Sequence, residues 1–93
     1  MPVREASWLV SRGALLVDVR ERDEFTTGTL PDAVNLPLSE LPHRFRELDA
    51  DRPIALVCRS GNRSREAAEL LTARGFRDVV DLAGGIQATR IAA

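Results

Sequence analysis

Four short runs of aliphatic residues mark the chain, separated by stretches in which apolar residues recur at helical spacing. Such runs are typical of buried strands. They occupy residues 14–19, 33–36, 54–58 and 79–82. The run IALVC at 54–58 shows no alternation with polar residues, so we expect a central strand that is covered on both faces.

The stretches between these runs predict helices. They cover residues 4–13, 21–28, 39–48 and 64–75, and a further helix is expected at 84–93. Gly13, Gly28 and Gly75 stand where three of them should end, because glycine tolerates the left-handed conformation that closes a helix. Ser39 is the expected N-cap of the helix at 39–48.

Helices and strands alternate almost throughout, which indicates an α/β fold with a mainly parallel sheet and helices on both faces. A length of 93 residues leaves room for one core, so we expect residues 1–93 to form a single domain. In such a sheet the reactive loops gather at the carboxyl ends of the strands. Cys58 stands at one of these ends.

Composition narrows the function classes. The formal net charge of −1 argues against general binding of nucleic acid or anionic membranes. One cysteine makes neither an internal disulfide nor a cysteine-rich metal site. The first residues lack a long apolar segment, and no stretch approaches the roughly 20 apolar residues that span a bilayer. We therefore expect a soluble protein in a reducing, cytoplasmic setting.

The loop CRSGNRS, residues 58–64, carries the candidate chemistry. It leads into a predicted helix, whose N-terminal amides and partial positive charge attract an anion. Arg59 and Arg63 add full positive charges, and Gly61 and Asn62 favour a tight turn in which successive amides curl around the sulfur. Cysteines in such surroundings have pKa values of roughly 3.5–7.5. We therefore predict that Cys58 is a catalytic thiolate and not an inert buried cysteine.

Three motifs follow the order of those of a known family. LVDVRERDEFTTGTLPDAVNLPLSEL, ALVCRSGNRSREAAELLTARGF and VVDLAGGI follow one another in order and cover nearly the whole sequence. Together they resemble the single-domain rhodaneses, the thiosulfate sulfurtransferase family. The resemblance implies the rhodanese-like three-layer domain, with a mainly parallel central sheet flanked by helices on both faces.

The resemblance also implies a mechanism. Cys58 would attack the outer sulfur of thiosulfate, release sulfite and hold a persulfide until cyanide or a cellular thiol removes the sulfur. Arg59 and Arg63 would bind the sulfonate group, and no metal or organic cofactor would be needed. The amides of the loop would hold the terminal sulfur; they belong to Arg59, Ser60, Gly61, Asn62, Arg63 and Ser64.

Two positions depart from the family pattern. Thr29, in GTLP, stands where the family usually has histidine, and Thr89 stands where it usually has tryptophan. Both positions look structural, so we expect altered packing near the site and an effect on substrate preference.

Other functions remain open. Cysteine phosphatases carry five residues between cysteine and arginine, whereas here Arg63 comes one position earlier. The cradle should therefore be too tight for a phosphoryl group, which ranks phosphatase or arsenate reductase chemistry below sulfur transfer. A binding module without turnover is a second alternative, although such relatives usually lose the cysteine or the loop. A third is a persulfide relay that takes its sulfur from a protein donor or gives it to a protein acceptor.

Several other residues are given structural interpretations. Asp18 and Arg20, in DVRE, are expected to form an ion pair that ties the first strand to its neighbours. His43 is interpreted as an ordinary surface histidine, and Trp8 as a core or edge packing residue. The pair Gly84-Gly85 is interpreted as a tight turn.

Overall fold

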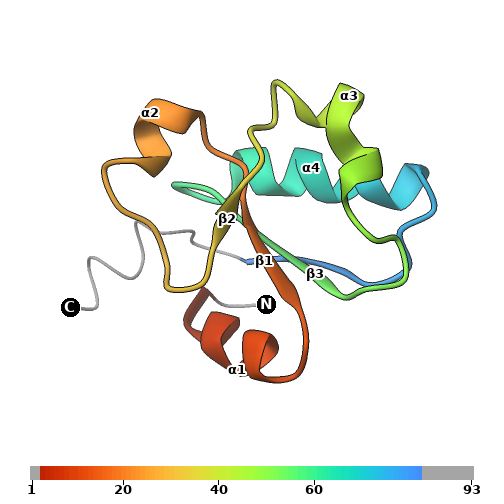
Figure 1. The fold of residues 1–93 in the computed structure, drawn as a ribbon, viewed down its shortest axis with the longest axis horizontal. Coiled ribbons are helices and arrows are strands. Elements are labelled where there is room, and N and C mark those ends of the chain that lie inside the picture. Colours follow the sequence, from red (N-terminus) through yellow and green to blue (C-terminus); the bar gives the residue numbers. More distant parts are fainter. Residues whose placement is uncertain (1–2, 83–93) are drawn as a thin grey trace.

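The computed structural model describes residues 3–82, which form a parallel four-stranded sheet with helices on both faces (Figure 1). The strands are β1 (Leu15–Asp18), β2 (Val34–Asn35), β3 (Ile54–Val57) and β4 (Val79–Asp81), in the order β2-β1-β3-β4. All three neighbouring pairs are parallel, so the predicted α/β fold is confirmed.

Two core clusters cover the two faces of the sheet. Because successive strand residues point to opposite faces, Ile54 and Leu56 of β3 lie in one cluster, and Ala55 and Val57 lie in the other. The first cluster packs against α3 (Leu41–Arg44) and α4 (Asn62–Ala73), and the second packs against α1 (Ala6–Ser11). All four residues of β3 are buried, as expected of a central strand.

The remaining helical segments are short. They are α2 (Arg22–Phe25) and the 3-10 turns Val3–Glu5 and Phe45–Glu47. At the start of α2, the Glu21 side chain accepts a hydrogen bond from the backbone of Glu24, and the Glu24 side chain accepts one from the backbone of Glu21. These reciprocal hydrogen bonds form a capping box. No helix within residues 3–82 is long and apolar enough to cross a membrane.

Several predicted boundaries are wrong. The helix expected at 64–75 begins earlier, at Asn62, because Gly61 provides the N-cap position. Ser39 does not cap the helix expected at 39–48: Glu40 occupies that position, and the Ser39 hydroxyl donates to the Glu21 carboxylate instead. The helix predicted at 84–93 and its Gly84-Gly85 turn lie outside the described residues.

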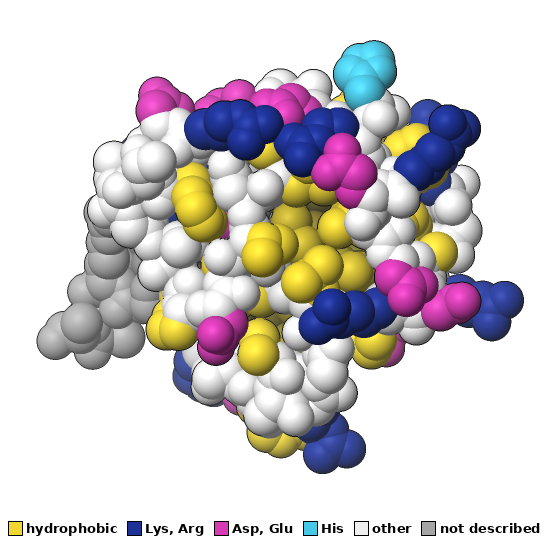
Figure 2. Space-filling view, viewed as in Figure 1, with side chains coloured by type: hydrophobic (Ala, Val, Ile, Leu, Met, Phe, Trp, Pro, Cys, Tyr) yellow, Lys and Arg dark blue, Asp and Glu magenta, His cyan; other side chains and the backbone are white. Residues whose placement is uncertain are grey.

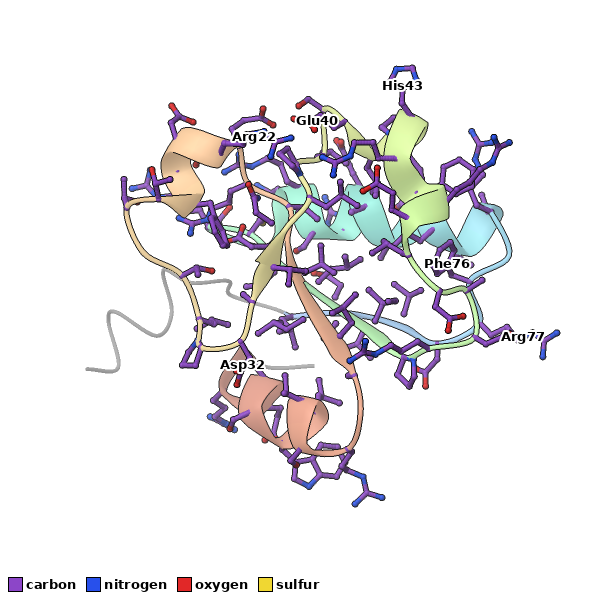
Figure 3. All side chains as sticks on the ribbon, in the orientation of Figure 1. Arg22, Asp32, Glu40, His43, Phe76 and Arg77 are labelled. Carbon is purple, nitrogen blue, oxygen red and sulfur yellow. The ribbon has the colours of Figure 1, made fainter. Side chains whose placement is uncertain are left out.

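Two predictions about single side chains have different outcomes. His43 is exposed and projects from α3 away from the sheet, as a surface histidine should (Figure 3). Trp8 is not a core residue, since it is 50% exposed and its ring lies under the Arg12 guanidinium at 4.8 Å. This cation–π contact holds the ring at the surface of α1.

The strand register determines where the candidate site lies. Asp18 at the end of β1 pairs with Asn35 of β2 and with Val57 of β3, and Leu56 of β3 pairs with Asp81 of β4. The carboxyl ends of the four strands therefore lie along one edge of the sheet, and Cys58 follows directly after Val57 at that edge.

Candidate active site

The loop after β3 turns within a few residues. Gly61 has a φ of 104°, in the left-handed region that side-chain-bearing residues rarely adopt. This turn points the Gly61 amide back toward the sulfur of Cys58, and α4 begins at Asn62. The sulfur thus lies at the N-terminal end of the longest helix that the structure describes within residues 3–82.

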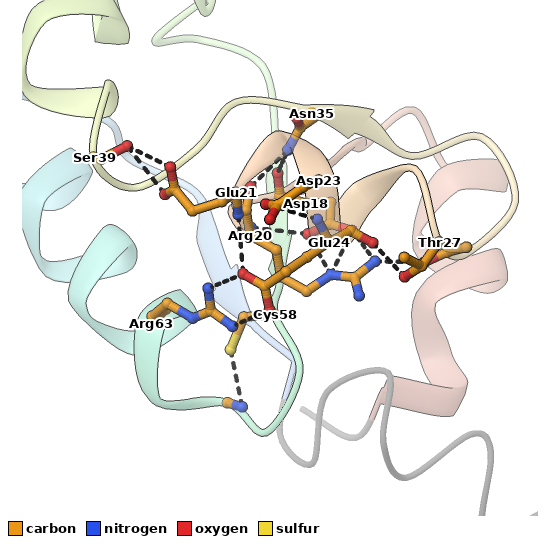
Figure 4. A network of polar contacts seen from close by, with 12 residues as sticks. Asp18, Arg20, Glu21, Asp23, Glu24, Thr27, Asn35, Ser39, Cys58 and Arg63 are labelled. Carbon is orange, nitrogen blue, oxygen red and sulfur yellow. Dashed lines mark hydrogen bonds and ion pairs between the residues drawn. The ribbon is translucent and has the colours of Figure 1, made fainter.

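The Cys58 sulfur is enclosed by hydrogen-bonding groups. The Gly61 amide donates to Sγ at 3.0 Å, the contact drawn at the sulfur in Figure 4, and the Ser64 hydroxyl oxygen lies 3.6 Å from Sγ. The side chain is buried, with 1% of the residue exposed. Among residues 3–82 it is the only cysteine, and it is free.

These contacts change the acidity of the thiol. Burial raises the pKa of Cys58, whereas hydrogen bonds from the Ser64 hydroxyl and from the amides of Ser64, Gly61 and Ser60 lower it. The hydrogen bonds prevail, and the pKa lies below the ordinary value of a cysteine. These hydrogen bonds therefore stabilise the thiolate relative to that of an ordinary cysteine, and none of them comes from a histidine.

Arg63 has a partner that the sequence reasoning missed. Its guanidinium binds both carboxylate oxygens of Glu24 in α2, at 2.6 and 2.9 Å (Figure 4). The hydrogen bond from Arg63 is the main reason why the pKa of Glu24 falls to about 2, so this carboxylate stays ionised. Both side chains are about one-third exposed, at 34% each. Nothing in the spacing of Glu24 and Arg63 along the chain indicates this contact.

The other residues of the loop face outward. Arg59, Ser60 and Asn62 are exposed, and within residues 3–82 the structure gives Arg59 no ion pair. Its positive charge therefore stands at the loop surface near the sulfur, whereas the charge of Arg63 is matched by that of Glu24. The structure thus separates the two arginines, which the sequence treats alike.

Ser64 connects the sulfur to a second acidic residue that the sequence reasoning missed. The Ser64 hydroxyl is fully buried and lies 2.5 Å from Oδ1 of Asp81, at the end of β4. The same oxygen lies 3.1 Å from the carbonyl oxygen of Gly61. The position of Asp81 at the carboxyl end of a predicted strand was the signal that could have singled it out.

Asp18 and Arg20 form a buried ion pair beside the site. Arg20 Nη2 lies 2.9 Å from Asp18 Oδ2, and the two side chains are 5% and 0% exposed. Thr29 donates to the same carboxylate oxygen at 2.7 Å, and Arg20 also donates to the Gly28 carbonyl. Asn35 of β2 donates to the carbonyl oxygens of Asp18 and Arg20. The pair joins β1 to the segment after α2.

Thr29, the first departure from the family pattern, is thus hydrogen-bonded to the buried ion pair. Thr89, the second departure, lies outside the described residues.

The surface near the site carries both signs of charge. Figure 2 shows basic and acidic side chains side by side along the edge that carries α2 and α3. Ion pairs link Glu40 to Arg22 and Arg44, and Arg44 to Glu47. Among residues 3–82, no group of three or more histidine, cysteine, aspartate or glutamate side chains is arranged to hold a metal ion.

Comparisons with known proteins agree on one family. The pattern of the rhodanese-like domain matches residues 4–92. A thiosulfate sulfurtransferase GlpE from Pseudomonas syringae is 39% identical over 90 residues, which cover 97% of this chain and 85% of that protein. A sulfurtransferase from Allochromatium vinosum is 43% identical over 72 residues, covering 77% of this chain and 67% of its own length.

Solved structures show the same fold. The human single-domain sulfurtransferase TSTD1 superimposes with a TM-score of 0.84 at 28% identity, covering 100% of this chain and 96% of its own. A rhodanese-related protein from Thermoplasma volcanium gives a TM-score of 0.83 at 34% identity, covering 92% of this chain and 85% of its own.

Proposed function

The chain belongs to the rhodanese-like domain family and is a sulfurtransferase, and we propose that it carries the transferred sulfur as a persulfide on Cys58. Thiosulfate is the proposed donor, and cyanide or a cellular thiol is the proposed acceptor. The observation that carries the proposal is the sulfur of Cys58 at the head of α4, with the Gly61 amide 3.0 Å away.

The proposed cycle has two displacements. In the first, the Cys58 thiolate attacks the outer sulfur of thiosulfate; a sulfur–sulfur bond forms to Cys58, and the sulfur–sulfur bond of thiosulfate breaks. The electron pair of that bond leaves with sulfite. In the second, the acceptor attacks the outer sulfur of the persulfide, and Cys58 departs as a thiolate. No proton is required in either step if both nucleophiles are anions, so the loop needs no general base.

The loop supplies charge stabilisation in both steps. We propose that the amides of residues 59–64 hold the outer sulfur, because amides that already face the sulfur favour negative charge there. Arg59 and Arg63 are the proposed ligands of the sulfonate group. The exposed Arg59 is free to approach an anion, whereas Arg63 would have to share its guanidinium with Glu24.

The cycle also bears on the cellular setting. A persulfide carrier needs its single thiol reduced, which supports the proposal of a reducing compartment such as the cytoplasm. Sulfur transfer from or to a protein remains an alternative, and Bacillus subtilis contains a relative named putative sulfur carrier protein, which is 35% identical over 72 residues.

Intact mass spectrometry tests the first displacement. The reduced protein is mixed with thiosulfate, and we expect a gain of one sulfur atom together with release of sulfite in equal amount. Cyanide should reverse the gain. The control is protein whose Cys58, the one cysteine of the chain, has been alkylated with iodoacetamide; it should gain nothing.

Other outcomes would redirect the proposal. A folded protein with a reactive thiol that gains no sulfur from thiosulfate would exclude this donor. A gain from a persulfidated protein donor in that case would indicate the relay. No gain from either donor would support the alternative in which the chain is a binding module without turnover.

Glu24→Gln tests how Arg63 is used. The substitution removes the negative charge that competes with an anionic substrate, and the pKa of about 2 means that this charge is present at every working pH. We expect the KM for thiosulfate to fall by up to about fivefold at low salt, the range for an exposed pair. Steady-state kinetics measures this effect.

Asp23→Asn, an equal charge change at an exposed neighbour in α2, is the matched control and should leave the KM nearly unchanged. A rise in the KM of Glu24→Gln would mean that Glu24 positions Arg63 for the substrate and does not compete with it.

A further inference from the structure

The Ser64 hydroxyl has more acceptors than it can serve. Its oxygen lies 2.5 Å from Asp81 Oδ1, 3.1 Å from the Gly61 carbonyl oxygen and 3.6 Å from the Cys58 sulfur. A hydroxyl carries one proton and two lone pairs, so only one of these neighbours receives its hydrogen bond at a time. Ser64 and Cys58 are both buried, so the sulfur depends on its protein neighbours and not on water for hydrogen bonds.

The carboxylate is the strongest of the three acceptors. A distance of 2.5 Å is in the range of charge-assisted O–H···O⁻ bonds, which are roughly twice as strong as neutral ones. The hydroxyl proton therefore points to Asp81 while Cys58 is a thiol. The oxygen then presents a lone pair to the sulfur, and the thiol donates to it, which is the direction of the 3.6 Å contact.

When Cys58 ionises, the sulfur needs a hydrogen-bond donor where the thiol needed an acceptor. A thiolate has no proton to donate, and a hydroxyl oxygen that still faced it with a lone pair would repel it. Ser64 stabilises the thiolate only if it turns its proton to the sulfur, and it then gives up Asp81. The two anions compete for one proton.

We propose that Asp81 is a positioning residue that acts on Cys58 through the Ser64 hydroxyl, holding the hydroxyl as an acceptor for the thiol and opposing its use as a donor to the thiolate. The proposal deepens the function proposed above, since it concerns the same nucleophile. Asp81 thus opposes the effect of the loop amides, which lower the pKa of Cys58.

A limit on how far the pKa of Cys58 falls is useful in a sulfur carrier. A thiolate of very low basicity is abundant but a poor nucleophile, because nucleophilicity falls with the pKa of the thiol. The same thiolate is a better leaving group when the persulfide gives up its sulfur. Asp81 moves Cys58 toward the nucleophilic side of this balance, and this would speed attack on the donor relative to release to the acceptor.

Other charges around the sulfur come from neighbouring elements. Arg63 of α4 is neutralised by Glu24, and Arg20 is neutralised by Asp18 at the end of β1. The acidic Glu21 contributes to the field at Arg63 and is itself held by Ser39. The variants below change none of these residues, so their contribution to the titration of Cys58 is constant across the comparison.

The test is the pH profile of Cys58 alkylation by iodoacetamide, followed by intact mass. Asp81→Asn keeps the shape of the side chain, and its amide can donate to the Ser64 oxygen, which frees the hydroxyl proton for the sulfur. We expect the midpoint of the profile to fall by about one pH unit, the size of one hydrogen bond to a charged group. Ser64→Ala should move the midpoint upward.

The double variant separates a route through Ser64 from a direct charge effect. In the Ser64→Ala background, Asp81→Asn should shift the midpoint by less than about half as much as in the wild type. Any other contact of Asp81 is lost in both backgrounds and cancels. An unchanged or higher midpoint for Asp81→Asn, or an equal shift in both backgrounds, would overturn the proposal.

A second measurement covers the case in which Asp81→Asn does not fold. In the wild type, the carboxylate carbon resonance of Asp81 should move at the titration midpoint of Cys58, because the hydroxyl leaves Asp81 when the thiol ionises. A resonance that does not respond there would contradict the proposal. Neither readout requires sulfur transfer, so failure of the proposed function leaves this test intact.

Discussion

Cys58→Ser is expected to reduce thiocyanate formation from thiosulfate and cyanide by about 10⁴-fold or more, since removal of a covalent nucleophile has effects of this order or larger. A serine hydroxyl has no appreciable anionic form at neutral pH, and the hydrogen bonds that lower the pKa of the Cys58 thiol cannot overcome that difference. The fold should survive, because serine is nearly isosteric at this position. Steady-state kinetics and a denaturation curve measure the two effects.

The matched control moves the thiol without removing it. Cys58→Ser combined with Ser60→Cys keeps one cysteine in the loop but places it at an exposed position. It should be as inactive as the single variant, because the Gly61 amide faces position 58. Substantial activity in the single variant would exclude Cys58 as the sulfur carrier, and substantial activity in the double variant would show that the thiol need not face the Gly61 amide.

Asp18→Asn is expected to lower the free energy of unfolding by about 3–5 kcal/mol, the cost of leaving a buried charge without its counter-ion. Arg20 cannot lose its proton, and its side chain is only 5% exposed, so water cannot replace the carboxylate. Small domains are stable by roughly 5–15 kcal/mol, so this loss is a large fraction of the total. Urea denaturation, read as the midpoint and slope, measures it.

Glu40→Gln is the control for this substitution. It makes the same isosteric change at a carboxylate that also binds arginine, but the Glu40 side chain is 33% exposed and its partner Arg22 is 61% exposed. Exposed pairs contribute about 0–1 kcal/mol, so the loss should be far smaller. Equal losses in the two variants would show that the Asp18–Arg20 pair is not the structural tie that we infer.

Local patterns were sufficient to predict the architecture. Buried aliphatic runs and helical spacing depend on neighbours within a few residues, and they located every strand of the described sheet to within one or two residues. Helix ends were predicted less well. Ser39 has the side chain of an N-cap, but a contact with Glu21, distant in sequence, engages its hydroxyl instead.

The candidate nucleophile was also identifiable from the sequence. A single cysteine between an apolar run and a helix, in a loop with glycine and arginine, indicates an activated thiol by local rules alone. What the sequence could not show is the state of each charge in that loop. The sequence does not distinguish Arg59 from Arg63. Only the fold brings Glu24 of α2 into contact with Arg63.

By itself, then, the sequence determined the α/β alternation, the position of the candidate active-site loop and the identity of its thiol, because these follow from periodicity and from groups that adjoin one another in the chain. Only the tertiary structure decided which acids face the site. Glu24 and Asp81 come from α2 and β4, and they reach Arg63 and Ser64 because parallel strands align their carboxyl ends at one edge. Hydrogen bonds and charges act over a few ångströms in space, whatever the separation along the chain, and so the balance of charge around Cys58 is a property of the fold.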